Sequence, residues 1–212
     1  MGFLKCTVSL LFISLHLTLL AQYKEGMVEY AITVKPGDTT QYQKQRAALM
    51  FDSKMALHFN DTMSRMDFKM GKGMLTTIIV QLNRKKGLSL TSSSKGKFAY
   101  FLTDEYFEPK KEGDVRVELI DETATILGYK CKKALMYVEG IMTTYWYTND
   151  FTLEIKNQEI VNKHIPGFPL KYSTVKDGLF MEFEVSNMLF SVKNPELVFS
   201  MAVPEGFKML KK

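Results

Sequence analysis

The chain has 212 residues, of which 46% are hydrophobic and 24% are charged, and its formal net charge is +5. This composition is typical of a folded domain and argues against a disordered chain. A charge this small, spread over a whole domain, excludes an extended nucleic-acid footprint, so we expect no nucleic-acid partner.

The first 21 residues have the order of a secretory signal peptide. Lys5 supplies a positive charge, a mostly apolar run follows from Cys6 to Leu20, and the small residue Ala21 precedes the polar Gln22. The run is shorter than the roughly 20 apolar residues that cross a bilayer. We therefore expect residues 1–21 to be cleaved, a single β-rich domain over residues 22–212, and a periplasmic or secreted location. A retained membrane anchor is the less favoured alternative.

The expected cleavage separates the two cysteines. Cys6 leaves with the signal, so Cys131 has no internal disulfide partner in the mature chain. Lipid attachment requires a cysteine at the first mature position, and Cys6 lies far upstream of it. Cys131 is more typical of a small buried hydrophobe than of a reactive thiol.

Alternating apolar and polar residues predict β-strands along most of the chain. The clearest are residues 28–34, 65–70, 142–148 and 179–185, with weaker signals at 74–82, 86–92, 97–103, 115–121, 129–138 and 169–176. Turn signals separate these segments, at Pro36-Gly37-Asp38, Asn60-Asp61, Gly71-Lys72-Gly73, Lys95-Gly96, Glu139-Gly140 and Asp177-Gly178. The best helix signal starts at Asp150 as an N-cap and covers residues 151–163.

Short strands joined by tight turns predict a mainly β fold with an antiparallel sheet. So many large apolar residues on one face of a sheet need a cover. We expect the sheet to curl into a barrel-like shape, because helical signals are few. The alternatives are a sandwich, or a helix or long loop laid across the concavity.

The sequence lacks the residue patterns of common catalytic and metal sites. After removal of His16, only His58 and His164 remain, far apart in the sequence, and no His-Glu-x-x-His or Gly-x-Ser-x-Gly motif is present. The adjacent carboxylates Asp104/Glu105 and Asp121/Glu122 would point to opposite faces of a strand. We therefore expect no enzyme, no catalytic residue, no metal site and no cofactor.

Methionine and aromatic residues concentrate on the predicted strand faces. Core packing is the simplest interpretation. A concave face lined by flexible methionines and aromatic rings would also suit an apolar ligand. On this hypothesis the ligand-lining residues are Met66, Phe68, Met70, Tyr145, Tyr147, Leu179, Met181 and Phe183.

The segment from Ile126 to Ala134, Ile-Leu-Gly-Tyr-Lys-Cys-Lys-Lys-Ala, resembles an uncharacterised family of exported Bacteroidota proteins, domain of unknown function 4412. Trp146-Tyr147-Thr148, residues 166–170 and residues 203–207 extend the likeness. More distantly, the chain is similar to GLPGLI-type proteins and to the lipoprotein carrier LolA. The resemblance implies a curved antiparallel sheet or half-barrel, with few helices or loops covering its apolar concave face. It assigns no catalytic residue.

These observations lead to two main functional hypotheses. The first is a non-enzymatic periplasmic binding protein that holds a lipid, a lipoprotein acyl chain or an apolar peptide on the concave face. The alternative is an envelope protein-interaction or stress adaptor whose interior is filled by its own side chains. The expected partners are accordingly a lipid or lipoprotein, or an envelope protein. A hydrolase or redox enzyme is a third hypothesis, and it would rest only on Cys131 and scattered polar residues.

Overall fold

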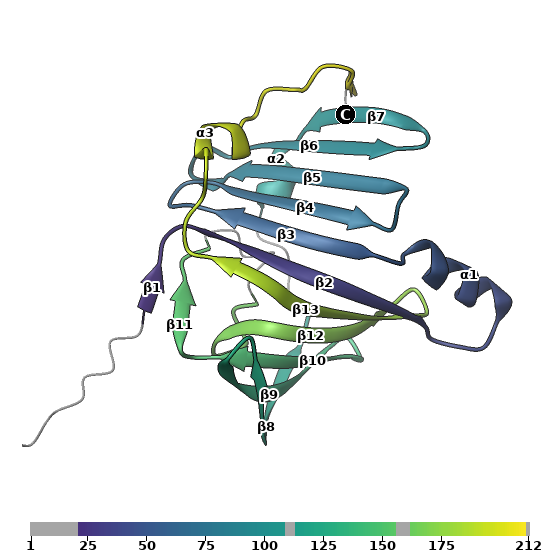
Figure 1. The fold of residues 1–212 in the computed structure, drawn as a ribbon, viewed down its shortest axis with the longest axis vertical. Coiled ribbons are helices and arrows are strands. Elements are labelled where there is room, and N and C mark those ends of the chain that lie inside the picture. The colour runs from purple at the N-terminus through teal and green to yellow at the C-terminus, as the bar shows by residue number, and fades with distance from the viewer. Residues whose placement is uncertain (1–20, 109–112, 156–161, 211–212) are drawn as a thin grey trace, which may run out of the picture.

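A computed structural model describes residues 21–108, 113–155 and 162–210. The dominant element is a twelve-stranded sheet in the order β14-β7-β6-β5-β4-β3-β2-β13-β12-β10-β9-β8. Every neighbouring pair is antiparallel except the short β14, which runs parallel to β7. The sheet is a twisted, curved layer (Figure 1), and it does not close, because β14 and β8 are its two edges. The predicted mainly β fold with an open curved sheet is confirmed.

The elements follow the chain with few long connections. The strands are β1 (Ala21–Tyr23), β2 (Gly26–Pro36), β3 (Ser53–Phe59), β4 (Ser64–Met70), β5 (Met74–Gln81), β6 (Lys86–Ser93), β7 (Gly96–Phe101), β8 (Val115–Ile126), β9 (Tyr129–Val138), β10 (Ile141–Thr148), β11 (Phe151–Leu153), β12 (Phe168–Lys176), β13 (Leu179–Leu189) and β14 (Lys208–Met209). The helices are α1 (Gln41–Leu49), α2 (Asp104–Phe107) and α3 (Pro195–Val198), with a 3-10 turn at Leu82–Arg84.

All ten strands predicted from alternation are present, and the structure adds β1, β3, β11 and β14. The turn predicted at Pro36-Gly37-Asp38 leads into α1 instead of a hairpin. Thr40 begins this helix, because its Oγ accepts a hydrogen bond from the Gln43 N–H at 3.3 Å. A run of good helix formers follows.

The helix predicted over residues 151–163 is wrong where the structure describes it. Residues 151–153 form β11, which pairs in parallel with β1. Phe151 and Leu153 are buried while Thr152 is exposed, so burial on a strand period overrides the N-cap signal of Asp150. Residues 156–161 of the predicted helix, and residues 1–20 of the predicted signal peptide, lie outside the described residues.

The two faces of the sheet differ in chemistry. One face, called the inner face here, holds the main core, which includes Val28, Tyr30 and Ile32 of β2 with Met55 of β3. The opposite, outer face places Lys171 of β12 against Glu182 and Glu184 of β13, at 3.1 and 2.8 Å. The main core is therefore one-sided, as expected for a sheet with one solvated face.

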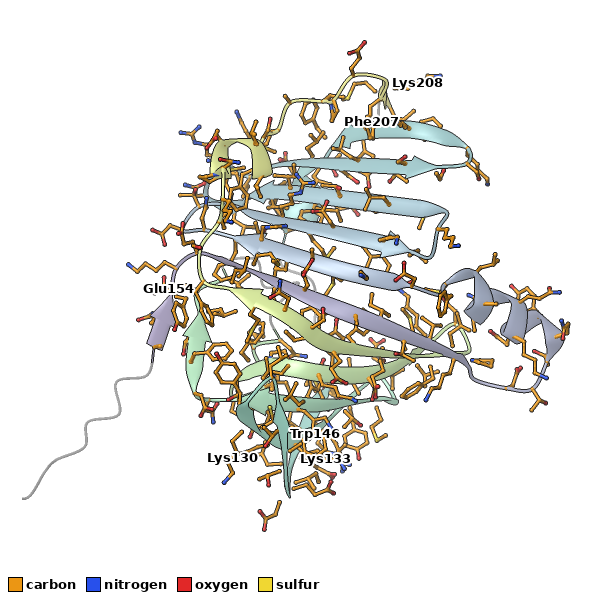
Figure 2. The ribbon with its side chains drawn as sticks, viewed as in Figure 1. Lys130, Lys133, Trp146, Glu154, Phe207 and Lys208 are labelled. Atoms are coloured by element: carbon orange, nitrogen blue, oxygen red, sulfur yellow. The ribbon has the colours of Figure 1, made fainter. Side chains whose placement is uncertain are left out.

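The C-terminal segment crosses the outer face over β6 and β7. Met201, Val203 and Phe207 pack on Leu88, Leu90 and Ala99. The Leu210 N–H then donates to the Ala99 carbonyl at 2.8 Å, and β14 joins the edge of β7. Figure 2 shows Phe207 and Lys208 at this end of the sheet, opposite the end where Lys133 lies beside Trp146. Of the helices, α1 packs its Ala47 into the inner-face core, whereas the Val198 carbonyl of α3 contacts Arg65 on the outer face. α1 and α3 thus lie on opposite faces of the sheet.

Candidate apolar binding site

The structure places all eight predicted ligand-lining residues on the inner face. Residues that pair directly across neighbouring strands lie on the same face. Phe68 pairs with Met55, which pairs with Tyr30 of the inner face. Phe183 pairs with Ile32, which lies on the same face of β2 as Tyr30. On the other side, Tyr145 pairs with Tyr172, which in turn pairs with Phe183. The remaining residues lie on the same face by alternation or by packing in its core: Met66, Met70, Tyr147, Leu179 and Met181.

These eight residues do not form one compact site. Four strands separate β4 from β10, which places their backbones about 24 Å apart at a spacing of about 4.8 Å per strand. Five of the eight are buried, namely Tyr145, Tyr147, Leu179, Met181 and Phe183. Met66, Phe68 and Met70 are half-buried. Their role as ligand-lining residues stays a prediction.

An aromatic stack lies on the inner face across β13, β12 and β10. Tyr172 stacks on Phe183 with centroids 4.5 Å apart and on Tyr145 at 5.7 Å. The Tyr30 hydroxyl donates to the Pro169 carbonyl at 2.9 Å. Burial raises the pKa of Tyr30, Tyr145 and Tyr172, so these phenols stay neutral at physiological pH. The stack therefore behaves as an apolar core.

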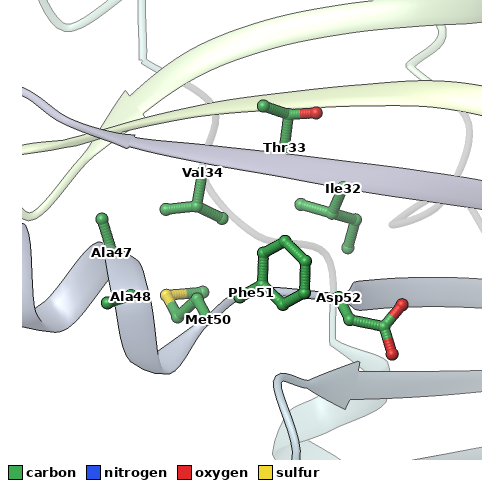
Figure 3. Close-up of a pocket in the computed structure, with 8 residues that line it drawn as sticks. All are labelled: Ile32, Thr33, Val34, Ala47, Ala48, Met50, Phe51 and Asp52. Carbon is green, nitrogen blue, oxygen red and sulfur yellow. The ribbon is translucent and has the colours of Figure 1, made fainter.

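An open pocket of about 300 Å³ lies between α1 and β2 (Figure 3). Ile32 and Val34 come from the inner face of β2, and the other side is formed by α1 and the segment that leads to β3. The full lining is Ile32, Thr33, Val34, Ala47, Ala48, Met50, Phe51 and Asp52. The volume is at the lower end of the range for small-molecule sites, and the lining is mostly apolar with two polar side chains. Such a pocket suits a narrow apolar group.

Polar contacts fix α1 at both ends of this pocket. Arg46 Nη1 donates to the Asp177 carbonyl at 2.7 Å, which ties the helix to the β12–β13 turn. At the other end, Ser53 Oγ donates to the Met50 carbonyl at 2.6 Å and accepts from the Gly71 N–H at 3.0 Å. Only Ala47 of α1 is fully buried. The helix is thus held mainly by backbone carbonyls and contributes little to the core.

A second pocket, of about 490 Å³, lies between β11 and the segment before β12. Its lining is Asn149, Phe151, Thr152, Leu153, Asn162, Lys163, Ile165, Pro166, Gly167 and Phe168. Asn162 Nδ2 donates to the Tyr145 hydroxyl at 3.2 Å, which connects this pocket to the aromatic stack. None of the eight predicted residues lines either of these two pockets.

The strongest polar cluster lies on the outer face. Arg65 donates from Nε and Nη2 to both carboxylate oxygens of Asp67, at 2.8 and 3.0 Å, and from Nη1 to the Val198 carbonyl at 3.0 Å. Thr77 Oγ1 donates to Asp67 at 2.5 Å. This cluster holds the C-terminal segment on the sheet. His58 lies on the neighbouring strand β3, and its partial burial lowers its pKa, so it is neutral at pH 7.

Cys131 is completely buried, and this burial raises the pKa of its thiol to about 11. Across residues 21–108, 113–155 and 162–210, no three His, Cys, Asp or Glu side chains gather in a way that could hold a metal ion. Within the same ranges, none of the helices has the length and hydrophobicity that a membrane crossing requires.

Sequence reasoning missed the residues of the α1 pocket. Their signal was present: Thr40 is a strong N-cap residue, and Gln41 to Leu49 contains neither glycine nor proline nor a β-branched residue. The strand alternation on both sides obscured it, because Pro36-Gly37-Asp38 also fits a hairpin turn.

Comparison with known proteins gives partial likenesses. A family model described as the N-terminal domain of an N-glycanase peptide matches residues 78–161, less than half of the chain. Among curated proteins, none matches this chain.

Two solved structures of PNGF-II are 14% and 16% identical, with TM-scores of 0.44 and 0.45, and cover 88% and 89% of this chain. The chain spans about a third, 31%, of their length. A LolA superfamily protein from Nitrosomonas europaea is 11% identical, with a TM-score of 0.24, over 84% of this chain and 90% of its own. At these TM-scores the likenesses assign no function.

Proposed function

We propose that this protein is a non-enzymatic binding protein for an apolar ligand, which enters the pocket between α1 and β2. The single observation that supports this is the pocket itself, about 300 Å³ in volume and lined mainly by Ile32, Val34, Ala47, Met50 and Phe51. An acyl chain or an apolar peptide side chain is the ligand class that fits. Export to the periplasm or beyond, after cleavage near Ala21, is part of the proposal and rests on the N-terminal sequence.

The proposed binding is driven by burial of apolar surface, at about 25 cal/mol per Å² of apolar area removed from water. The lining supplies few hydrogen-bonding side chains. It would therefore select ligands by shape and hydrophobicity more than by a specific headgroup. Because the contacts of Arg46 and the Met50 carbonyl hold α1 near its C-terminal end, small shifts of the helix would adapt the pocket to ligands of different width. The likeness of residues 126–134 to domain of unknown function 4412, and through it to LolA-like carriers, points to the same ligand class.

Uptake of a fluorescent fatty-acid probe tests the proposal. Ala48→Trp places a large ring in the pocket from the exposed side of α1 and should abolish uptake. Gln45→Trp adds the same ring to the same helix at an exposed position outside the pocket lining, and should bind the probe normally. Native mass spectrometry of protein from its own host should also reveal a bound apolar molecule. A clean apo mass together with no probe uptake would contradict the proposal.

A second candidate is an envelope protein-interaction or stress adaptor. The observation that favours it is the burial of Tyr145, Met181 and Phe183, since a filled inner face leaves no open concavity there. Crosslinking in cells should then recover a reproducible protein partner, and Ala48→Trp should leave that partner in place. The partial match to an N-glycanase N-terminal domain brings no reaction to this chain, because it covers less than half of it.

A further inference from the structure

Three large apolar side chains are exposed around the α1 pocket. Leu49 and Phe51 are each 77% exposed and Tyr42 is 66% exposed. Tyr42 and Leu49 are seven residues apart on the helix, so they lie on the same side of it. Phe51 follows directly at the end of α1 and lines the pocket (Figure 3). The pocket therefore opens beside an apolar edge that faces solvent.

Basic residues surround this apolar edge. The helix carries Lys44 and Arg46 and no acidic residue, and Arg46 lies over the Tyr42 ring at 5.5 Å. The β4–β5 turn packs against the end of α1, because a Cβ on Gly71 would collide with the Leu49 carbonyl. Lys72 follows Gly71 directly in this turn.

The charge is concentrated at this edge of the molecule. Residues 41–54 and 69–73 contain five basic side chains and one carboxylate, a net charge of +4, while the whole chain has +5. The carboxylate, Asp52, accepts a hydrogen bond from Lys69 at 2.8 Å. That bond is the main cause of the lowered pKa of Asp52, and Lys54 and Lys72 lower it further. The adjoining segments are balanced, with Lys35 and Lys176 against Asp38 and Asp177.

We infer that α1, residues 50–54 and the β4–β5 turn form a docking surface for an anionic lipid bilayer. This inference rests on the proposed function, since docking would place the pocket mouth at the membrane that supplies or receives the apolar ligand. Protruding apolar residues ringed by Lys and Arg are the chemistry of an interfacial membrane contact. Each basic side chain near an anionic surface strengthens binding about fivefold. A second protein copy that docked through this same surface would bring like charges together and would be repelled.

Sedimentation with lipid vesicles tests the inference. The purified protein should bind vesicles that contain phosphatidylglycerol and should not bind vesicles of pure phosphatidylcholine. Raising the salt concentration from 0.1 to 1 M should weaken binding, because the Debye length falls from about 10 to about 3 Å. Equal binding to both vesicle types would overturn the inference.

Paired variants distinguish binding through this surface from nonspecific adsorption to vesicles. The double variant Leu49→Ser/Phe51→Ser should lose vesicle binding at least tenfold, while Leu119→Ser/Leu197→Ser, at positions 64% and 68% exposed elsewhere, should keep it. In Lys54→Glu/Lys72→Glu the affinity for vesicles should fall at least tenfold. In Lys130→Glu/Lys132→Glu, on β9, it should not fall. Equal losses in both members of a pair would refute the docking surface. Unchanged vesicle binding with altered self-association in Leu49→Ser/Phe51→Ser would assign the surface to a second copy instead.

Different results would refute the proposed pocket and the proposed docking surface. Ala48→Trp blocks the pocket but leaves the exposed ring of charges and apolar groups intact, so it should abolish probe uptake and retain vesicle binding. Probe uptake without any vesicle binding would remove the docking surface and leave the proposed function standing. Vesicle binding without probe uptake by the unmodified protein would remove the proposed function alone.

Discussion

The rings of Tyr172 and Phe183 lie face to face on neighbouring strands, with centroids 4.5 Å apart and planes only 7° from parallel. β12 and β13 pair these two residues directly, and Tyr145 stacks on Tyr172 from β10, on the other side of β12. The stack lies on the inner face across β13, β12 and β10. That part of the sheet is a packed core.

Phe183→Ala should therefore reduce the free energy of unfolding by about 3–5 kcal/mol, because it removes a buried ring and leaves a cavity beside Tyr172. Urea denaturation followed by circular dichroism measures this. Phe51→Ala, at an exposed position, should change stability by less than about 0.5 kcal/mol. Similar losses in both variants would mean that the stack is not a core.

Gly71→Ala should lower the melting temperature, whereas Gly73→Ala in the same turn should not. Gly71 has a φ of +54°, and a Cβ there would collide with the Leu49 carbonyl, while a Cβ at Gly73 meets nothing within 4 Å. We expect Gly71→Ala to cost more than about 1 kcal/mol. Differential scanning calorimetry measures the melting temperatures of the two variants. An unchanged melting temperature in Gly71→Ala would show that α1 does not pack against the β4–β5 turn.

Arg65→Gln should destabilise the protein by about 2 kcal/mol, because it leaves the half-buried Asp67 carboxylate without its charged partner. It should also free the C-terminal segment, since Arg65 binds the Val198 carbonyl. Chemical denaturation and limited proteolysis of residues 195–210 measure the two effects.

Arg116→Gln is the matched control, because Arg116 and Glu118 form a pair with the same spacing at 2.9 Å. Their side chains are 68% and 42% exposed, against 28% and 20% for Arg65 and Asp67. We expect an effect of at most about 0.5 kcal/mol for the exposed pair. Faster cleavage of the C-terminal segment in Arg116→Gln would contradict this assignment.

Cys131 should react slowly with iodoacetamide at pH 8 in the native protein and rapidly in urea, because burial raises the pKa of its thiol to about 11. The folded protein keeps the proton that the unfolded chain releases near pH 8.5. Stability from this group is therefore complete below about pH 8.5 and decreases as the pH rises toward 11. Cys131→Ala should remove this part of the pH dependence, and equal alkylation rates with and without urea would refute the burial.

Alternation alone predicted ten of the strands and placed Met66, Phe68, Met181 and Phe183 on apolar strand faces. This succeeded because side-chain direction in a strand repeats every two residues, a local property of the chain. Helix α1 was missed and a helix after Asp150 was wrongly predicted. In both places local signals were ambiguous, and pairing with distant segments, β1 with β11 and α1 with Asp177, decided the outcome.

Local residue patterns are enough to identify a β-rich chain with one strongly apolar sheet face, and the N-terminal residues are the basis for expecting export. Which part of that face is filled and which part is open depends on the folded arrangement. Burial of Tyr145 and Phe183 depends on strand register across β10, β12 and β13, while the pocket exists because α1 is held beside β2 by contacts with the turns at Gly71 and Asp177. Such long-range contacts are set by the packing of the whole sheet, so no local pattern encodes them.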